Sequence, residues 1–124
     1  MTIDIRRTEI ELDAELCRRS LRHFTREAWH VLEPGRPLVW GWPLDAITDH
    51  LEAVHRGDIT RLLMTVPPGS MKSLSTRVFA PVWRWLWQPR ARFIGSSYSH
   101  SLALRDNRRA KMLIESEWFQ DRFP

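Results

Sequence analysis

Apolar residues recur at helical spacing through the first third of the chain. Between residues 10 and 32 they return every three or four positions, which places them on one face of a helix; they are Ile10, Ala14, Cys17, Leu21, Phe24, Ala28 and Leu32. Thr8 and Glu11 have the spacing of a capping box, which predicts a helix start there. The breaker sequence at residues 33–37 ends this region, so we expect one or two helices before it.

A third helix is predicted from Pro43, because proline suits the first turn of a helix. Its apolar face would combine Leu44, Ile47, Leu51 and Val54, and the sequence His55-Arg56-Gly57 provides a C-terminal end. Together these helices form an N-terminal helical segment, residues 1–57.

After residue 57 the pattern changes to alternating extended and helical stretches. Residues 59–66 form an apolar, strand-like run, a second strand is expected at residues 92–97 after a break at residues 88–90, and a helical pattern follows each of them. We therefore predict an α/β fold for residues 58–124, in the order β-α-β-α after the helical segment.

The two helices of this second region carry different features. The first is predicted to begin at Ser73 and to be kinked by Pro81. The second runs from Ser99 or His100 to Glu115. It carries basic residues at helical spacing, which would either contact DNA or a neighbouring subunit or form a solvated face; they are Arg105, Arg108 and Arg109.

Composition narrows the class of protein. A hydrophobic content of 43% in 124 residues is that of a folded domain. The net charge of +4 comes almost entirely from arginine, since Lys72 and Lys111 are the only lysines. The sequence shows no signal peptide and no apolar run of membrane-spanning length, so we expect a cytoplasmic protein without membrane contact. The single cysteine, Cys17, and the spacing of His50, His55 and His100 predict no zinc site.

Residues 66–73 read Val-Pro-Pro-Gly-Ser-Met-Lys-Ser, which ends like the phosphate-binding loop G-x-x-x-x-G-K-[ST] but lacks both glycines. Lys72 supplies the ammonium that reaches outer phosphates, and Ser73 supplies the hydroxyl that holds Mg²⁺. Because Met71 carries a Cβ, we expect its backbone to stay in a region open to ordinary residues. The alternative is a structural Pro-Gly turn with Lys72 merely solvated.

The stretch from Val66 to Leu74 resembles the nucleotide-binding loop of bacteriophage terminase large subunits, many of which carry a Pro-Pro-x-x-x-Lys-Ser form. The resemblance covers roughly residues 20–124, with further similar stretches in the family's order at residues 40–43, 80–83, 92–99, 102–107 and 113–119.

This resemblance implies the N-terminal part of an ATPase that drives double-stranded DNA into a viral capsid. It implies an incomplete P-loop NTPase core of the ASCE type, ATP and Mg²⁺ as cofactors, and action in the bacterial host cytoplasm. The implied partners are DNA, the portal protein, the small terminase subunit and further copies in a ring. Ser73 would hold Mg²⁺, and the nucleotide would be bound by Pro68, Gly69, Ser70, Met71, Lys72 and Ser73.

Two departures from the family pattern change what is expected of this chain. Gly69 stands where many relatives carry an arginine that acts on the γ-phosphate, so another arginine or another subunit would have to supply it. The acidic pair that holds Mg²⁺ and orients water is missing, as are the later core strands and the nuclease domain. We therefore expect a catalytically incomplete fragment that is marginally stable or oligomeric. The alternatives are a non-catalytic nucleotide- or DNA-binding gene remnant and an unrelated small α/β binding module.

Overall fold

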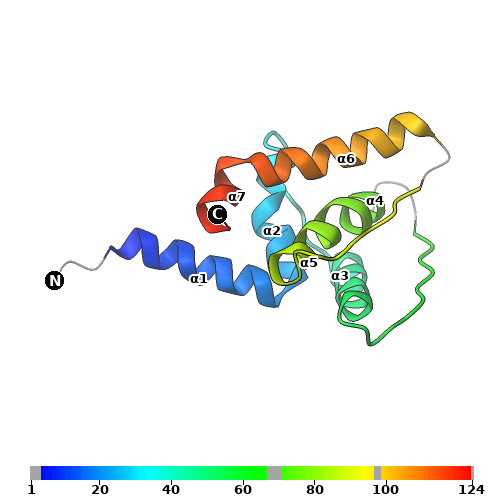
Figure 1. Cartoon of the computed structure of the whole chain (residues 1–124), viewed down its shortest axis with the longest axis horizontal. Helices are drawn as coiled ribbons and strands as arrows, with labels where there is room; N and C mark the ends of the chain where they lie inside the picture. Colours follow the sequence, from blue (N-terminus) through cyan, green and yellow to red (C-terminus); the bar gives the residue numbers. More distant parts are fainter. Residues whose placement is uncertain (1–3, 67–70, 97–98, 124) are drawn as a thin grey trace.

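The computed structural model describes residues 4–66, 71–96 and 99–123, and every regular element within them is helical (Figure 1). In chain order these are α1 (Ile5–Arg19), α2 (Leu21–Leu32), α3 (Trp42–His55), α4 (Lys72–Leu74), the π-helical turn η1 (Ser75–Phe79), α5 (Ala80–Trp87), α6 (His100–Glu115) and α7 (Glu117–Arg122).

The α/β prediction, and with it the incomplete P-loop NTPase core, is therefore wrong for the part of the chain that the structure describes. Neither residues 59–66 nor residues 91–96 form a strand, and no backbone hydrogen bond joins the two segments. The alternating pattern persists in burial, since Leu62 and Met64 pack on the core while Leu63 is 92% exposed. A strand requires a neighbouring extended segment to pair with, and neither segment has one among the described residues.

The helices before residue 57 agree with the sequence pattern, except at the first helix start. The capping box is wrong, because α1 begins one turn earlier, where the Asp4 carboxylate accepts a hydrogen bond from the Arg7 N–H. Ser20 then divides the continuous apolar pattern into two helices. Its N–H donates to the Leu16 carbonyl, which ends α1, and its hydroxyl accepts from the His23 N–H, which caps α2.

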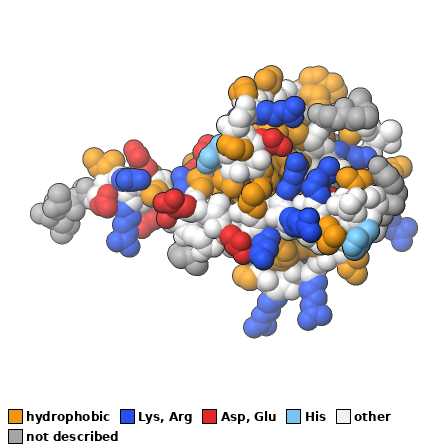
Figure 2. Space-filling view, turned by 90° about the horizontal axis from the view of Figure 1, so that it is seen from above, with side chains coloured by type: hydrophobic (Ala, Val, Ile, Leu, Met, Phe, Trp, Pro, Cys, Tyr) orange, Lys and Arg blue, Asp and Glu red, His pale blue; other side chains and the backbone are white. Residues whose placement is uncertain are grey.

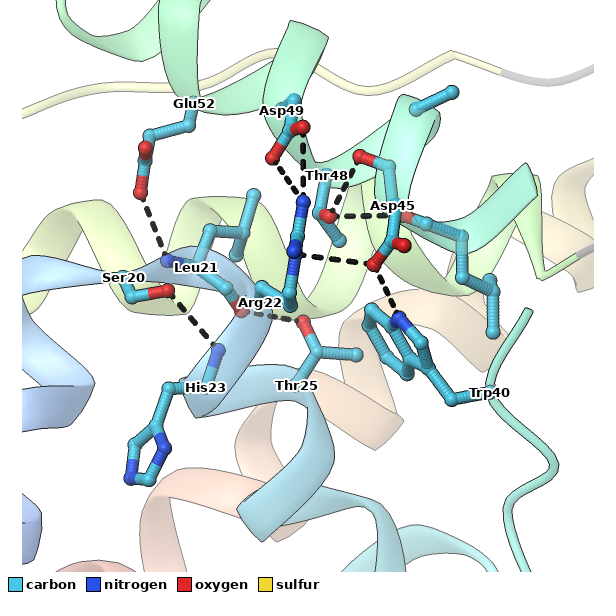
Figure 3. Close-up of polar contacts among 12 residues, drawn as sticks. Ser20, Leu21, Arg22, His23, Thr25, Trp40, Asp45, Thr48, Asp49 and Glu52 are labelled. Carbon is cyan, nitrogen blue, oxygen red and sulfur yellow. Dashed lines mark hydrogen bonds and ion pairs between the residues drawn. The ribbon is translucent and has the colours of Figure 1, made fainter. Parts of the chain in front are cut away.

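Polar contacts from α3 fix its position on α2 (Figure 3). The Glu52 carboxylate accepts from the Leu21 N–H at 3.0 Å and so satisfies a free amide in the first turn of α2. The Arg22 guanidinium pairs with Asp45 at 3.1 Å and with Asp49 at 2.8 Å. These contacts lie at the surface and therefore orient the two helices more than they stabilise them.

Both ends of α3 follow the predicted signals. Pro43 lies in its first turn, and Gly57 has a φ of 87°, the left-handed conformation that terminates a helix.

Elements α4, η1 and α5 follow one another without a gap, forming one helical run over residues 72–87. Its hydrogen bonding widens at η1, where the Ala80 N–H donates to the Ser75 carbonyl five residues back. Pro81 follows directly and has no N–H to donate, so the ladder is altered where a kink was predicted.

The core combines helices from both halves of the chain. Phe24, Phe79, Trp83 and Leu113 are completely buried in one apolar cluster. The Trp83 indole N–H donates to the Cys17 carbonyl at 2.8 Å, which ties α5 to α1. At the end of the chain, the Ser116 hydroxyl caps α7. Of the helices described, none is long and apolar enough to cross a membrane.

The N-terminal part of α1 projects away from this body (Figure 1). In the C-terminal half of α1, Ala14 and Cys17 are buried, whereas Ile5, Leu12 and Leu16 are exposed apolar residues of the same helix. Helix α6 crosses the opposite side of the body, and α7 returns the chain toward α1 and α2.

Candidate anion-binding site

Lys72 and Ser73 are exposed in the first turn of the helical run 72–87. The amides of a first helical turn have no partner within the helix and favour anions. The remaining residues predicted to bind nucleotide, Pro68, Gly69 and Ser70, lie outside the described residues. The helix thus begins at Lys72, one residue before the predicted start at Ser73.

Met71 is the cap of this helix and has a φ of 62° and a ψ of 18°. The expectation that its backbone stays in a region open to ordinary residues is wrong, because this is the left-handed region that favours glycine. Two contacts hold it there: its side chain packs on the core, and its carbonyl accepts from the Ser75 N–H at 2.8 Å. The position thus has a glycine-like backbone without a glycine.

A pocket of about 440 Å³ opens at this helix start. Its walls come from the helix start, from η1, from the end of segment 91–96 and from α6; the lining residues are Lys72, Ser73, Arg77, Ser96, Leu102, Arg105 and Asp106. Three cations and one carboxylate leave a formal charge of 3 − 1 = +2 on the lining. Such a cavity attracts a multiply charged anion.

Asp106 holds two of these cations in place. It is only 5% exposed, and it pairs with Arg77 at 3.3 Å and with Arg105 at 3.5 Å. The carboxylate lies within α6 and Arg77 comes from η1, so the ion pair joins the two elements across the pocket. Sequence reasoning missed both Arg77 and Asp106. Arg77 could have been found, because it lies four residues after Ser73 and so on the same helix face.

Of the basic residues singled out on α6, only Arg105 reaches this pocket. Arg109 pairs instead with Glu33 at 3.7 Å, and Arg108 lines a separate, open pocket with Lys111. Seen from above, Lys and Arg side chains outnumber Asp and Glu on the face of the body (Figure 2). The three arginines therefore do not act as one group.

A second pocket of about 550 Å³ adjoins the first and shares Arg77, Ser96 and Asp106 with it. Aromatic rings line it, including Trp85 and Phe93 with centroids 5.4 Å apart. His55 also lines it, and burial together with the nearby Arg84 lowers the pKa of His55 to about 4, so its ring is neutral.

The residues present fit a Mg²⁺-bound polyphosphate in part. Three cations suit the phosphate oxygens, and the Ser73 hydroxyl suits Mg²⁺, which commonly binds through substrate phosphates and few protein ligands. Asp106 is the single carboxylate among the described residues lining this pocket, and its oxygens face two arginines. It is therefore not free to orient an attacking water.

Comparison with models of protein families, with curated proteins and with solved structures finds no match to this chain. A functional assignment therefore depends on the chemistry of the pocket and on the resemblance of the loop and its flanking motifs.

Proposed function

We propose that this chain binds the polyphosphate of ATP, with Mg²⁺, in the pocket that opens at Lys72 and Ser73. The observation that carries the proposal is the left-handed Met71 directly before Lys72, at the start of a helix where two arginines also line the pocket. A non-glycine residue in this conformation costs about 1–2 kcal/mol and persists where the surroundings hold it, often at ligand sites.

Each lining residue has a distinct role in this proposal. The Lys72 ammonium would contact the outer phosphates, and the Ser73 hydroxyl would contact Mg²⁺. Arg77 and Arg105, held by Asp106, would neutralise further phosphate oxygens in forked hydrogen bonds. Arg105 is then the candidate for the arginine that Gly69 cannot supply.

The resemblance to terminase large subunits extends the proposal to the biological setting. The chain would be the nucleotide-binding part of a motor that packages double-stranded DNA, acting in a ring with the portal protein and the small subunit. We propose binding without hydrolysis by this chain alone, because Asp106 is committed to two arginines. The helical fold gives this assignment no support beyond the pocket.

The two lysines offer a matched test by isothermal titration calorimetry with ATP and Mg²⁺. Lys72→Ala is expected to weaken binding at least about tenfold, because a charge-assisted contact contributes roughly 1.5–3 kcal/mol. Lys111→Ala is the control, since Lys111 lies outside the pocket and pairs with Glu115. Equal affinity of Lys72→Ala and the unmodified chain would disprove the proposed site.

Two arginines of α6 provide a second matched pair. Arg105→Ala should weaken binding of both ATP and tripolyphosphate several-fold, because Arg105 lines the pocket. Arg108→Ala should leave both affinities unchanged, because Arg108 lines a different surface. An effect of equal size for both variants would show that only the general positive charge of the face attracts the nucleotide.

A further inference from the structure

The corner between α1 and α2 brings together a thiol, an imidazole and a carboxylate, on elements that take no part in the anion pocket. One ligand atom each from Asp13, Cys17 and His23 lies within 4.8 Å of the others. Asp13 and Cys17 are four residues apart on α1 and therefore share a face. His23 follows the turn at Ser20, and its Nε2 is 2.7 Å from Asp13 Oδ1.

A further carboxylate, that of Glu27, lies on the same face of α2 as His23. Glu27 is four residues after His23 on α2 and is half-buried. It is not among the three side chains whose ligand atoms lie within 4.8 Å of one another, so its side chain would have to rotate to reach a cation held by them. Its carboxylate makes no ion pair or side-chain hydrogen bond within residues 4–66, 71–96 and 99–123. It is thus available to a cation.

We propose that Asp13, Cys17, His23 and Glu27 form a binding site for a divalent cation of the Zn²⁺ class. Zn²⁺ takes four ligands in a tetrahedron from this set of sulfur, nitrogen and oxygen donors. Helical bundles build metal sites in the same general way, from side chains that project toward one another from neighbouring helices. The sequence predicted no zinc site because it weighed Cys17 only with His50, His55 and His100. The fold brings a different histidine, His23, to the thiol.

Arg122 supports the site from α7. Its Nε donates to Asp13 Oδ2, which leaves Oδ1 directed toward His23 and the thiol. Hydrogen bonds from Arg122 and His23 to its two oxygens fix the orientation of the Asp13 carboxylate. Arg122 is thereby a positioning residue of the kind that orients metal ligands from the outer shell.

Binding exchanges one set of bonds for another in a balanced way. The cation displaces the proton of the Cys17 thiol, which leaves to solvent, and forms the metal–sulfur bond. The hydrogen bond between His23 and Asp13 is replaced by one metal bond from each residue. Because binding releases this proton, it should strengthen with rising pH.

The test uses Co²⁺ as a spectroscopic probe on the full chain after treatment with a chelator. A near-ultraviolet thiolate-to-cobalt absorption band is expected, and Zn²⁺ should abolish it by competition. Zn²⁺ should also raise the midpoint of thermal unfolding, because it binds the folded state. The absence of a thiolate band would overturn the proposal, whatever the result of the ATP titrations.

Substitutions distinguish the proposed metal ligands from nearby residues that do not bind the cation. His23→Gln and Glu27→Gln, at partly exposed positions, should each weaken Co²⁺ binding about tenfold or more, whereas His30→Gln on the same helix should have no effect. Cys17→Ser should remove the absorption band, and the partly exposed variants keep the test valid if that core change unfolds the chain. Unchanged affinity in His23→Gln or in Glu27→Gln would contradict the four-ligand set.

Discussion

Two regions of the molecule differ in how their backbone hydrogen bonds are made. One is the corner of α1, α2 and α3, and the other consists of the two extended segments, residues 59–66 and 91–96. At the corner, Ser20 serves two helix ends at once and Glu52 accepts a first-turn amide. In the extended segments no backbone hydrogen bond joins one to the other, and apolar side chains face solvent. A helix completes its bonds within itself, whereas a strand depends on a distant segment.

This difference explains where stability should be concentrated. Buried aromatic residues link the helices, as in the edge-to-face contact of Phe24 with Phe79 at 6.4 Å. The extended segments contribute only one side of their alternating pattern to the core. Substitutions at buried positions between the helices should therefore lower the free energy of unfolding much more than substitutions on the exposed side of the extended segments.

The largest effect is expected from Phe24→Ala. The ring is completely buried and contacts both Phe79 and Trp118, so its removal leaves a cavity between α2, η1 and α7. Chemical denaturation should show a loss of about 3–5 kcal/mol in the free energy of unfolding. Leu12→Ala on the exposed side of α1 is the control and should change it by less than about 0.5 kcal/mol. Comparable losses in the two variants would mean that Phe24 is not part of a packed core.

Acidification should destabilise the fold next most strongly, through His55. Its folded pKa of about 4 lies below the ordinary 6.5, so the unfolded chain binds more protons between these values. The contribution of neutral His55 to the free energy of unfolding is fully present above pH 6.5 and is lost as the pH falls toward 4. The loss should be on the order of 1–2 kcal/mol between pH 7 and 5. Denaturation curves for His55→Gln should lose this pH dependence; an unchanged slope would exclude His55 as its source.

Ser20→Ala tests the corner itself with a smaller expected effect. The hydroxyl that caps α2 is lost while the backbone contact to Leu16 remains, so the expected loss is about 1 kcal/mol. Thermal unfolding should report it as a lower midpoint. Ser20→Asp, which keeps a cap acceptor, should restore most of it, and a failure of that rescue would argue against a capping role.

The smallest stability effect should come from Ile94→Ser, on a side chain that is 100% exposed. The free energy of unfolding should change by less than about 0.5 kcal/mol. Self-association should nevertheless decrease, because exposed apolar residues on an unpaired extended segment favour contact between chains. Sedimentation velocity over a range of concentrations measures this; identical profiles for both proteins would locate any association elsewhere.

Sequence patterns found α2, α3 and α6 because their signals are local. The breaker at residues 33–37, Pro43 and Gly57 act within one or two turns of the chain. The strand predictions were wrong for the opposite reason. An alternating pattern indicates that one side of a segment is buried, but it does not show whether another segment lies alongside to pair with it. The first helix start failed because Asp4 is an equally good cap one turn before Thr8.

The candidate site divides along the same line. Lys72 and Ser73 could be named from their place in a motif, and Arg105 from its place on a basic helix face. Asp106 could not be named, because its role in holding the pocket's arginines depends on an ion pair with Arg77, which lies on another element across the pocket. Likewise, the approach of His23 to Cys17 follows from the turn at Ser20 rather than from any spacing of metal ligands.

The backbone of Met71 bears on how such loops are recognised. A glycine in a motif records a pair of dihedral angles, and Met71 reaches the left-handed angles with a different side chain. A search that compares letters rejects methionine at position 71, whereas one that compares dihedral angles would accept its backbone as glycine-like. A search for similar loops should therefore require the lysine and the serine or threonine by sequence, and should test the position before the lysine by its dihedral angles.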